Sequence, residues 1–268
     1  MTKRHKKTIY YSDLLNDDFS GSRVPQKKIN SKNFKYIHKG KIYRFWSWFL
    51  YYFFASPIVA IVTFFGFNII VKGRKNVRSL KKKGYFIYGN HTRWIDMAIP
   101  YVNVGQGRRV ALVANPAAVG IKGLGAFVNM LGILPLPQTF GGAKNFLKAM
   151  EYRLDHHNII AIYPEAHIWP FYTRIRPFSD ASFGYPVSFN APVVAMCTVY
   201  KKAFFFPKIR KPRMVIYLSK PFYPDLSLSK VEASKKLRDQ CYDFMIQIAS
   251  TKNEVEYYDY VFKEKKDQ

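Results

Sequence analysis

The chain has 268 residues, of which 49% are hydrophobic and 18% aromatic, so it can form a substantial core and is not intrinsically disordered. It carries 43 lysines and arginines against 17 acidic residues, a net charge of +26 that lies far outside the usual range of soluble enzymes. Such an excess indicates a polyanionic partner: nucleic acid, an anionic membrane surface or a phosphate-rich substrate.

The first 44 residues are basic and polar, with 12 lysines and arginines, 3 acidic residues and no clear hydrophobic period. This pattern predicts a flexible arm that faces a membrane. Each basic side chain near an anionic surface contributes about 1 kcal/mol of attraction, so the arm alone could hold the protein there.

Residues 45–71 contain no charged side chain over 27 positions, which is long enough for one membrane-spanning helix. Pro57 lies near the middle and predicts a break in the helix. Both flanks are basic, since residues 72–83 carry 7 lysines and arginines and no acid. Positive flanks mark the cytoplasmic side, and a single span cannot place both there. We therefore predict a monotopic or re-entrant anchor of two half-helices on the cytoplasmic face of the cell membrane, with a single span as the alternative.

From about residue 69 onward, short apolar runs alternate with helical patterns, which predicts an α/β fold with a central, mostly parallel sheet flanked by helices. The folded domain spans 72–250 and is followed by a polar C-terminal tail, 251–268. The last helix begins with the capping-box spacing of Ser229 and Glu232. The predicted strands are 69–73, 85–89, 109–114, 133–136, 158–163, 192–200 and 213–218; the predicted helices are 95–103, 119–130, 143–156 and 229–250.

The chain has two cysteines, which offer at most one disulfide and no framework for a metal. Cys197 lies in an apolar run and Cys241 in a helical pattern. We interpret both as buried free thiols, which fits a reducing compartment, and we expect no metal site.

The strand predicted at 85–89 leads directly into His91, and Asp96 follows five residues later. Ligands of open α/β sheets bind at the carboxyl ends of strands, so His91 is well placed for chemistry. An imidazole titrates near neutrality, and a carboxylate on its far nitrogen would fix the tautomer and stabilise the imidazolium. The spacing alone leaves a second interpretation open, in which His91 caps a turn and Asp96 is a solvated acid.

A second strand-end loop lies within residues 160–178, where Pro164 ends an apolar run and Glu165 follows. Beyond it, Arg174 and Arg176 alternate with aromatic residues. Guanidinium groups among aromatic rings suit binding of a phosphate or a lipid headgroup. A surface loop with arginine stems packed on rings is the alternative.

Four motifs in this order resemble the glycerolipid acyltransferase superfamily, the lysophosphatidic-acid acyltransferases. NHTRWID (90–96) is similar to the N-H-x4-D motif, YPEA (163–166) to the F-P-E-G block, and APVVAMCTV (191–199) to the later Pro-Val block; LGILPLP (131–137) matches a Gly-led strand. The resemblance covers roughly residues 66–200, and the hydrophobic N-terminal element is similar to the membrane-seating helices of some bacterial members.

The resemblance implies that 72–250 is an acyltransferase domain in which His91 is the general base and Asp96 orients it. The acceptor hydroxyl would attack the thioester of acyl-CoA or an acyl-carrier protein directly, with no covalent enzyme intermediate and no cofactor beyond this acyl donor. The chain has no G-x-S-x-G nucleophile motif, which agrees with that chemistry.

Two departures from the family concern the acceptor. Pro137 and Gln138 stand where members commonly carry an arginine, and Ala166-His167-Ile168 replaces Gly-Thr-Arg. The acceptor is predicted to be a lysophospholipid such as 1-acylglycerol-3-phosphate, with a glycolipid or another lysolipid as the alternative. The predicted substrate-binding residues are Arg93, Lys122, Glu165, His167, Arg174 and Arg176. For Glu165 the resemblance implies either acceptor binding or organisation of the site.

A different class of function, a non-enzymatic basic protein that binds nucleic acid or membrane, accounts for the charge equally well. It gives no role to the strand-end motifs, and the charge-free segment 45–71 disfavours nucleic acid. The expected partners are therefore an anionic membrane surface, the acyl donor and a lysolipid acceptor, and not nucleic acid.

Overall fold

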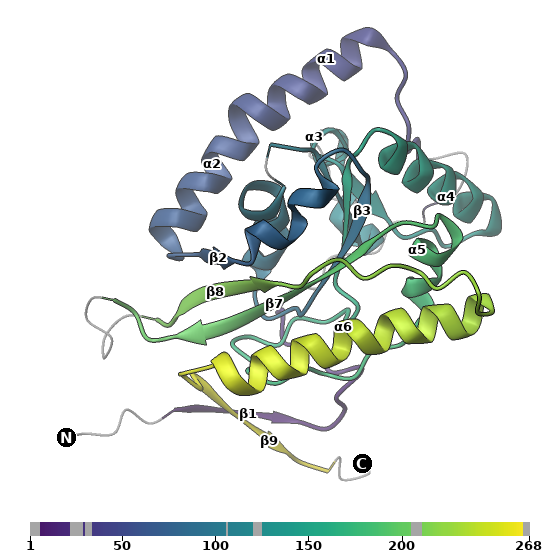
Figure 1. Ribbon diagram of the computed structural model, residues 1–268. Coiled ribbons are helices and arrows are strands. Elements are labelled where there is room, and N and C mark those ends of the chain that lie inside the picture. Colours follow the sequence, from purple (N-terminus) through teal and green to yellow (C-terminus); the bar gives the residue numbers. More distant parts are fainter. Residues whose placement is uncertain are drawn as a thin grey trace.

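The centre of the protein is a seven-stranded β-sheet (Figure 1). The computed structural model describes residues 6–21, 29, 34–105, 107–119, 125–204 and 211–264. In order across the sheet, the strands are β2 (Ile70–Lys72), β8 (Arg213–Leu218), β7 (Val193–Lys201), β3 (Tyr85–Gly89), β6 (Ile159–Ile162), β4 (Val110–Ala114) and β5 (Ile133–Pro135). β7 and β8 pair antiparallel, and the other neighbours in this sheet pair parallel.

The predicted α/β class is confirmed, and each of the seven predicted strands lies within one residue of its expected ends. The strands are continuous apolar runs because the sheet is covered on both faces. In β3, for example, Phe86 and Tyr88 join the core on one face, while Tyr85 and Ile87 join the core on the other.

Regular helices cover the face to which Phe86 and Tyr88 point. They are α4 (Phe140–Asp155), α5 (Gly184–Ser188) and α6 (Lys230–Lys252). Thr139 caps α4 by accepting a hydrogen bond from the Gly142 N–H, and Ser229 and Glu232 form the predicted capping box of α6. Both long helices therefore begin where their side chains satisfy free backbone N–H groups.

Short turns cover the opposite face: η3 (Arg74–Leu80), η4 (Trp94–Ala98) and η5 (Pro100–Val104). The predicted regular helix over 95–103 is wrong, because Pro100 cannot donate a hydrogen bond and divides the segment into a 3₁₀ turn and a π-type turn. Of the helix predicted at 119–130, the described part is α3 (Gly125–Met130). The remaining short turns are η6 (Pro116–Val119) and η7 (Ala181–Phe183).

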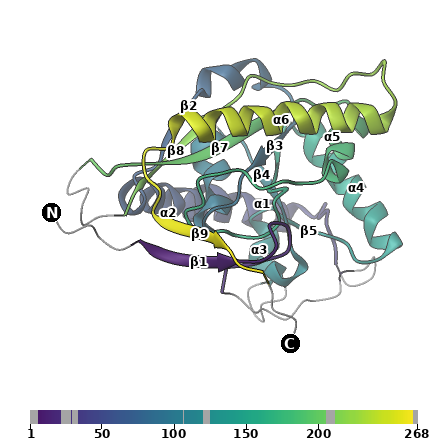
Figure 2. The same cartoon turned by 90° about the horizontal axis from the view of Figure 1, so that it is seen from below.

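The two ends of the chain form a second, two-stranded sheet, seen below the main sheet in Figure 1 and again in Figure 2. β1 (Lys7–Tyr11) pairs in parallel with β9 (Tyr258–Phe262). Trp169 packs against Tyr260 of this sheet. In the N-terminal segment, beyond β1, Tyr36 is buried in the main core. The predicted flexible arm is therefore wrong for residues 7–11, and the segment predicted as a polar tail contains a strand at 258–262, because each strand supplies the other's hydrogen-bonding partner.

The segment predicted to be two half-helices is one continuous helix from Lys41 to Gly66, made of α1 (Lys41–Phe49), η1 (Leu50–Ala55), α2 (Ser56–Ile61) and η2 (Val62–Gly66) (Figure 1). The predicted break at Pro57 is wrong, since Ala55 and Ser56 just before it keep helical backbone angles. The wider π-type turn of η1 precedes Pro57, which relieves the clash between a proline ring and the carbonyl four residues earlier.

This helix is amphipathic in the reverse of the usual sense. Its inward positions are Ser47, Tyr51 and Thr63, all buried and all bearing hydroxyl groups. Its large apolar side chains point outward instead: Ile42, Phe45, Trp46, Trp48, Phe53, Phe54, Ile58, Ile61, Val62, Phe64 and Phe65 are exposed. Surface helices of soluble proteins place their apolar stripe toward the core. An outward apolar face of this size marks a surface that meets lipid or a partner.

By length and composition, this is the one helix in the described part of the chain that could cross a membrane, and 11% of its most apolar window is buried. Its inner side is held to the domain by polar contacts. The Val110 N–H donates to the Tyr51 hydroxyl over 3.0 Å, and the Ser47 hydroxyl donates to the Met130 carbonyl over 2.7 Å. The helix is thus fixed against the domain along one side.

Candidate active site

The two predicted strand-end loops lie side by side. β3 and β6 are neighbours in parallel register, with Tyr88 opposite Ile162, so the loops after them leave the same edge of the sheet. His91 follows β3 and Glu165 follows β6. This juxtaposition is the carboxyl-end placement expected of a ligand site in an α/β fold.

His91 and Asp96 form the predicted pair. Nδ1 of His91 lies 3.3 Å from Oδ2 of Asp96, and the histidine side chain is 9% exposed. With Nδ1–H directed at the carboxylate, Nε2 carries the free lone pair, and no protein group within the described ranges bonds to it. The imidazole therefore has the arrangement that a general base requires.

Asp96 is fully buried and is held by the backbone of its own loop. Its Oδ2 accepts hydrogen bonds from the N–H groups of Thr92, at 2.5 Å, and Arg93, at 2.7 Å. Its second oxygen, Oδ1, is buried without a hydrogen-bond partner. A buried carboxylate oxygen that lacks a donor gains from positive charge nearby, and a protonated His91 supplies that charge.

The ring of Tyr163 fixes the plane of the imidazole. The two rings stack with centroids 4.7 Å apart at 27°, and the Tyr163 hydroxyl donates to the main-chain carbonyl of Asp96. Burial, together with the nearby charge of Asp96, raises the pKa of Tyr163 well above its usual value, so the hydroxyl stays a donor. The sequence interpretation missed this residue, although it directly precedes the Pro-Glu pair.

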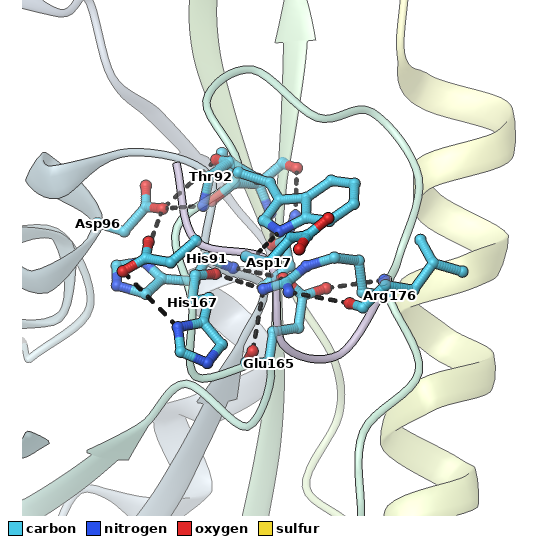
Figure 3. A network of polar contacts seen from close by, with 12 residues as sticks. Asp17, His91, Thr92, Asp96, Glu165, His167 and Arg176 are labelled. Carbon is cyan, nitrogen blue, oxygen red and sulfur yellow. Dashed lines mark hydrogen bonds and ion pairs between the residues drawn. The ribbon is translucent and has the colours of Figure 1, made fainter. Parts of the chain in front are cut away.

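Glu165 connects the two loops. One carboxylate oxygen accepts the His91 N–H at 3.0 Å and the other accepts the Arg176 N–H at 3.0 Å. Figure 3 shows His91, Asp96, Glu165 and Arg176 in one network of polar contacts. Burial raises the pKa of Glu165, while Arg176 and the two N–H groups act in the opposite direction. Both oxygens of Glu165 are thus bonded within the protein, where they join the loop after β3 to the loop after β6.

Arg176 was predicted to bind substrate, and the structure contradicts this. Its side chain is 1% exposed, and its guanidinium donates to the carbonyls of Leu14, Glu165 and His167. One Nη also lies 3.6 Å from the Glu165 carboxylate. Through its Nη groups, this buried arginine connects the N-terminal segment to the loop after β6.

The other predicted substrate-binding residues differ in availability. Arg93 lies between two rings, with its guanidinium 4.6 Å from the centroids of Phe67 and Phe171. Arg174 is exposed over the ring of Tyr172, at 5.4 Å. The half-exposed His167 has Nδ1 3.7 Å from a carboxylate oxygen of Asp18. Lys122 lies outside the described residues.

Two further residues brace the loop after β3 and were not singled out from the sequence. The Asn90 side chain exchanges two hydrogen bonds with the backbone of Thr198 in β7, at 2.8 and 3.1 Å. The Tyr200 hydroxyl donates to the Thr92 hydroxyl at 2.7 Å. Asn90 stands inside the NHTRWID motif, so the motif itself carried a signal for it.

Both cysteines are buried and free, as interpreted from the sequence. Burial raises the pKa of Cys197 and of Cys241, which keeps both as thiols. Neither lies among the site residues as a nucleophile. Within the ranges described, no group of histidine, cysteine, aspartate and glutamate side chains could hold a metal ion.

Comparison with known proteins agrees with this geometry. The family described as Acyltransferase matches residues 68–199, a range that contains both loops. The crystal structure of the 1-acyl-sn-glycerophosphate (LPA) acyltransferase PlsC from Thermotoga maritima has a similar fold, with a TM-score of 0.52 at 15% sequence identity. That match covers 80% of this chain and 97% of the other. Among curated proteins, a sequence search finds no match.

The fold, the two strand-end loops and the family match define this protein as an acyltransferase enzyme. The family match and the similar fold support the glycerolipid acyltransferase superfamily, which the order of the motifs indicated.

Proposed function

We propose that the enzyme transfers an acyl chain from a thioester donor to a hydroxyl of a lysophospholipid, with His91 as the general base. The observation that carries this proposal is the buried His91–Asp96 pair, at 3.3 Å, in a loop at the carboxyl edge of the sheet. The free Nε2 of His91 faces no protein partner in the described chain, so it is available to an acceptor hydroxyl.

In the proposed reaction, Nε2 removes the hydroxyl proton as the acceptor oxygen attacks the thioester carbonyl. The new ester bond forms and the carbon–sulfur bond breaks. The leaving thiolate takes the proton back from the imidazolium and departs as a thiol. Asp96 stabilises the imidazolium during this exchange, since its carboxylate is fixed by two backbone N–H groups. The step needs no covalent enzyme intermediate and no cofactor.

The acceptor is proposed to carry a phosphate, such as 1-acylglycerol-3-phosphate, bound by Arg93 and Arg174. Arg93 is favoured because it stands two residues after His91 in the same loop and has no carboxylate partner in an ion pair within the part of the chain described. With Arg176 directed at the protein, the site has fewer cations for a phosphate than the sequence indicated. A glycolipid or another lysolipid is therefore the alternative acceptor.

The protein is further proposed to lie on the cytoplasmic face of the membrane through its helix Lys41–Gly66. The outward apolar face of this helix supports the proposal, as does the contact of Phe67, just after the helix, with Arg93 and Trp94. This contact brings the end of the helix to the loop that carries His91.

Replacing the exposed Phe53 and Phe65 with aspartate should release the protein from vesicles. The matched control places aspartate at exposed positions on α6, such as Gln247. Full retention of the Phe53/Phe65 variant would contradict the assignment.

The decisive experiment incubates the purified full-length protein with acyl-CoA or acyl-carrier protein and a panel of lysolipids and glycolipids. Mass spectrometry identifies the acylated product, and thiol release gives the rate. His91→Ala should lower that rate by about 10²–10⁴ while leaving the melting temperature close to that of the wild type. Near-normal turnover in this variant, or the absence of any acylated product with every acceptor, would overturn the proposal.

A further inference from the structure

A second site lies at the edge of the sheet opposite His91. It is a cavity of about 400 Å³ at the amino ends of β4 and β6, next to Arg109 and Asn158, and the N-terminal half of the long helix forms one wall. Its size is within the range of small-molecule sites. Val110 and Ile159 pair at the start of these strands, whereas the candidate active site follows the far end of β6. The two sites are therefore separate.

The cavity is lined by arginines whose charge the protein does not neutralise. Arg44, Arg109 and Arg153 all face it, and none of them has an ion-pair partner in the described chain. The Nε atoms of Arg109 and Arg153 are buried without a hydrogen-bond partner. Arg109 donates through Nη2 to the Ser47 hydroxyl and to the Met130 carbonyl, both of which are neutral groups.

The neighbouring Arg108 shows what a purely structural arginine looks like in this protein. One Nη of Arg108 donates to the carbonyls of Leu80 and Lys83 at 2.8 and 2.9 Å, and the guanidinium packs over the ring of Tyr85. Its Nε is buried without a partner, as in Arg109 and Arg153, so the difference lies in the Nη groups. Arg153, by contrast, makes no side-chain hydrogen bond to any described residue. Its guanidinium lies 5.9 Å from the centroid of the Tyr152 ring. A partly buried guanidinium without a counter-charge costs stability, and an anion in the cavity would offset that cost.

The electrostatics agree with that interpretation. Burial lowers the pKa of both Arg109 and Arg153, and for Arg153 the positive charge of Arg109 adds to the effect. The two cations are therefore close enough to repel one another. An anion between them would relieve this repulsion, and the planar guanidinium group matches the oxygens of a phosphate.

The mouth of the cavity joins the outward apolar face of the helix. Trp48 lines the cavity and is also 46% exposed, and Arg44 on the same helix is exposed at the rim. Tryptophan and arginine at the border between polar and apolar surface are typical of the level of lipid headgroups. A lipid with its headgroup in the cavity could lay its chains along Phe45 and Trp48.

We propose that this cavity binds the phosphate group of an anionic membrane lipid, which is neither the acyl acceptor nor the donor. The bound lipid holds the N-terminal half of the helix at the headgroup level. The other end of the helix meets the His91 loop through Phe67 and Trp94, so this lipid sets the orientation of the active site on the membrane. The claim that the phosphate belongs to a lipid rests on the membrane association proposed above. The claim that the cavity binds phosphate does not depend on it.

The test compares the full-length protein on three probes: phosphatidylcholine vesicles with phosphatidylglycerol, vesicles given equal negative charge by oleate, and inorganic phosphate in solution. The wild type should prefer the phosphatidylglycerol vesicles over the oleate vesicles. Arg153→Gln and Arg44→Gln should each weaken binding to phosphatidylglycerol vesicles by about tenfold or more, as expected when a charge-assisted contact is lost.

Arg78→Gln is the matched control, because Arg78 is exposed in η3 and away from the cavity, and the variant loses the same single charge. This variant should keep the preference for phosphatidylglycerol. Arg44 is exposed, so Arg44→Gln keeps the test valid if Arg153→Gln lowers the melting temperature.

Equal losses in all three variants would show general surface attraction and overturn the proposal. Binding of inorganic phosphate that depends on Arg153, without any vesicle preference, would support the phosphate site and overturn the lipid as its source. Acyl transfer to detergent-dispersed lysolipid should be unchanged in Arg44→Gln. This separate readout distinguishes failure of the cavity proposal from failure of the proposed reaction.

Discussion

The loop after β3 and the loop after β6 each bury one carboxylate, but they treat its charge differently. Asp96 is held by two backbone N–H groups and keeps one oxygen without a donor, with the His91 imidazole as its neighbour. Glu165 has both oxygens bonded and a guanidinium beside it. The first loop leaves a charge that can respond to a proton on His91, whereas the second is already neutralised.

This difference separates chemistry from support within one network. A general base needs a partner whose interaction strengthens as the imidazole becomes charged, which the incompletely bonded Asp96 provides. The Glu165–Arg176 pair is already balanced within the protein, and Glu165 fixes the backbone N–H of His91. The comparison predicts that substitutions in the loop after β3 lower kcat, whereas substitutions in the loop after β6 lower the free energy of unfolding.

The largest effect is expected for Asp96→Asn. An asparagine whose amide oxygen takes the Oδ2 position still accepts from the Thr92 and Arg93 N–H groups and faces Nδ1 of His91, but it carries no charge and no longer stabilises the imidazolium. We expect kcat to fall by about 10²–10⁴. Thiol-release kinetics and a thermal melt measure the two quantities, and a large drop in melting temperature without a loss of kcat would reverse the comparison.

Glu165→Gln should act on stability first. It leaves the buried Arg176 without its counter-charge, and breaking a buried ion pair costs about 3–5 kcal/mol. Denaturant unfolding measures this loss. The matched control is Glu254→Gln, which breaks the exposed 2.6 Å pair with Lys201 and should cost less than about 1 kcal/mol. Similar losses in both variants would show that burial does not distinguish the pairs.

Arg93→Gln should change acceptor binding. If Arg93 grips the acceptor phosphate, its loss raises the KM for a phosphorylated lysolipid by about tenfold, with a smaller change for an acceptor that lacks phosphate. Arg174→Gln removes the equivalent charge from the loop after β6, where the side chain is exposed, and should have a smaller effect. A larger effect of Arg174→Gln would move the acceptor site to the second loop.

The smallest effect is expected for Tyr163→Phe. The ring still stacks on His91, and the variant loses one hydrogen bond to the Asp96 carbonyl, worth about 1 kcal/mol. We expect kcat to fall by a few-fold. Tyr200→Phe loses a comparable bond to Thr92 and should lower stability by a similar amount while leaving kcat nearly unchanged. Equal kcat values for the two variants would show that Tyr163 does not position the base.

Much of the fold was predictable because it depends on local patterns. The strands around Phe86 and Ile160 are short apolar runs, and a run buried on both faces carries its own signature. The capping box at Ser229 and Glu232 likewise fixed the start of α6 from four consecutive residues. These features could be predicted because every residue involved lies close by in the sequence.

The predictions that were wrong depended on contacts between distant segments. Residues 7–11 form a strand only because residues 258–262 lie beside them. Pro57 fails to break its helix because the preceding turn is wider, a feature with no clear sequence signal. Arg176 has the composition of a binding residue, but the carbonyl of Leu14, more than 160 positions away, accepts one of its hydrogen bonds.

The sequence by itself determined the α/β class, the superfamily and the pairing of His91 with Asp96, because those follow from short motifs and local periodicity. Only the tertiary structure decided which charges are free. It pairs Arg176 with the Glu165 carboxylate and with carbonyls from two segments, leaves Arg109 and Arg153 facing a cavity, and turns the apolar side of the helix outward. The physical reason is that a charge becomes available or occupied through neighbours brought together by folding, and those neighbours lie far apart in the chain.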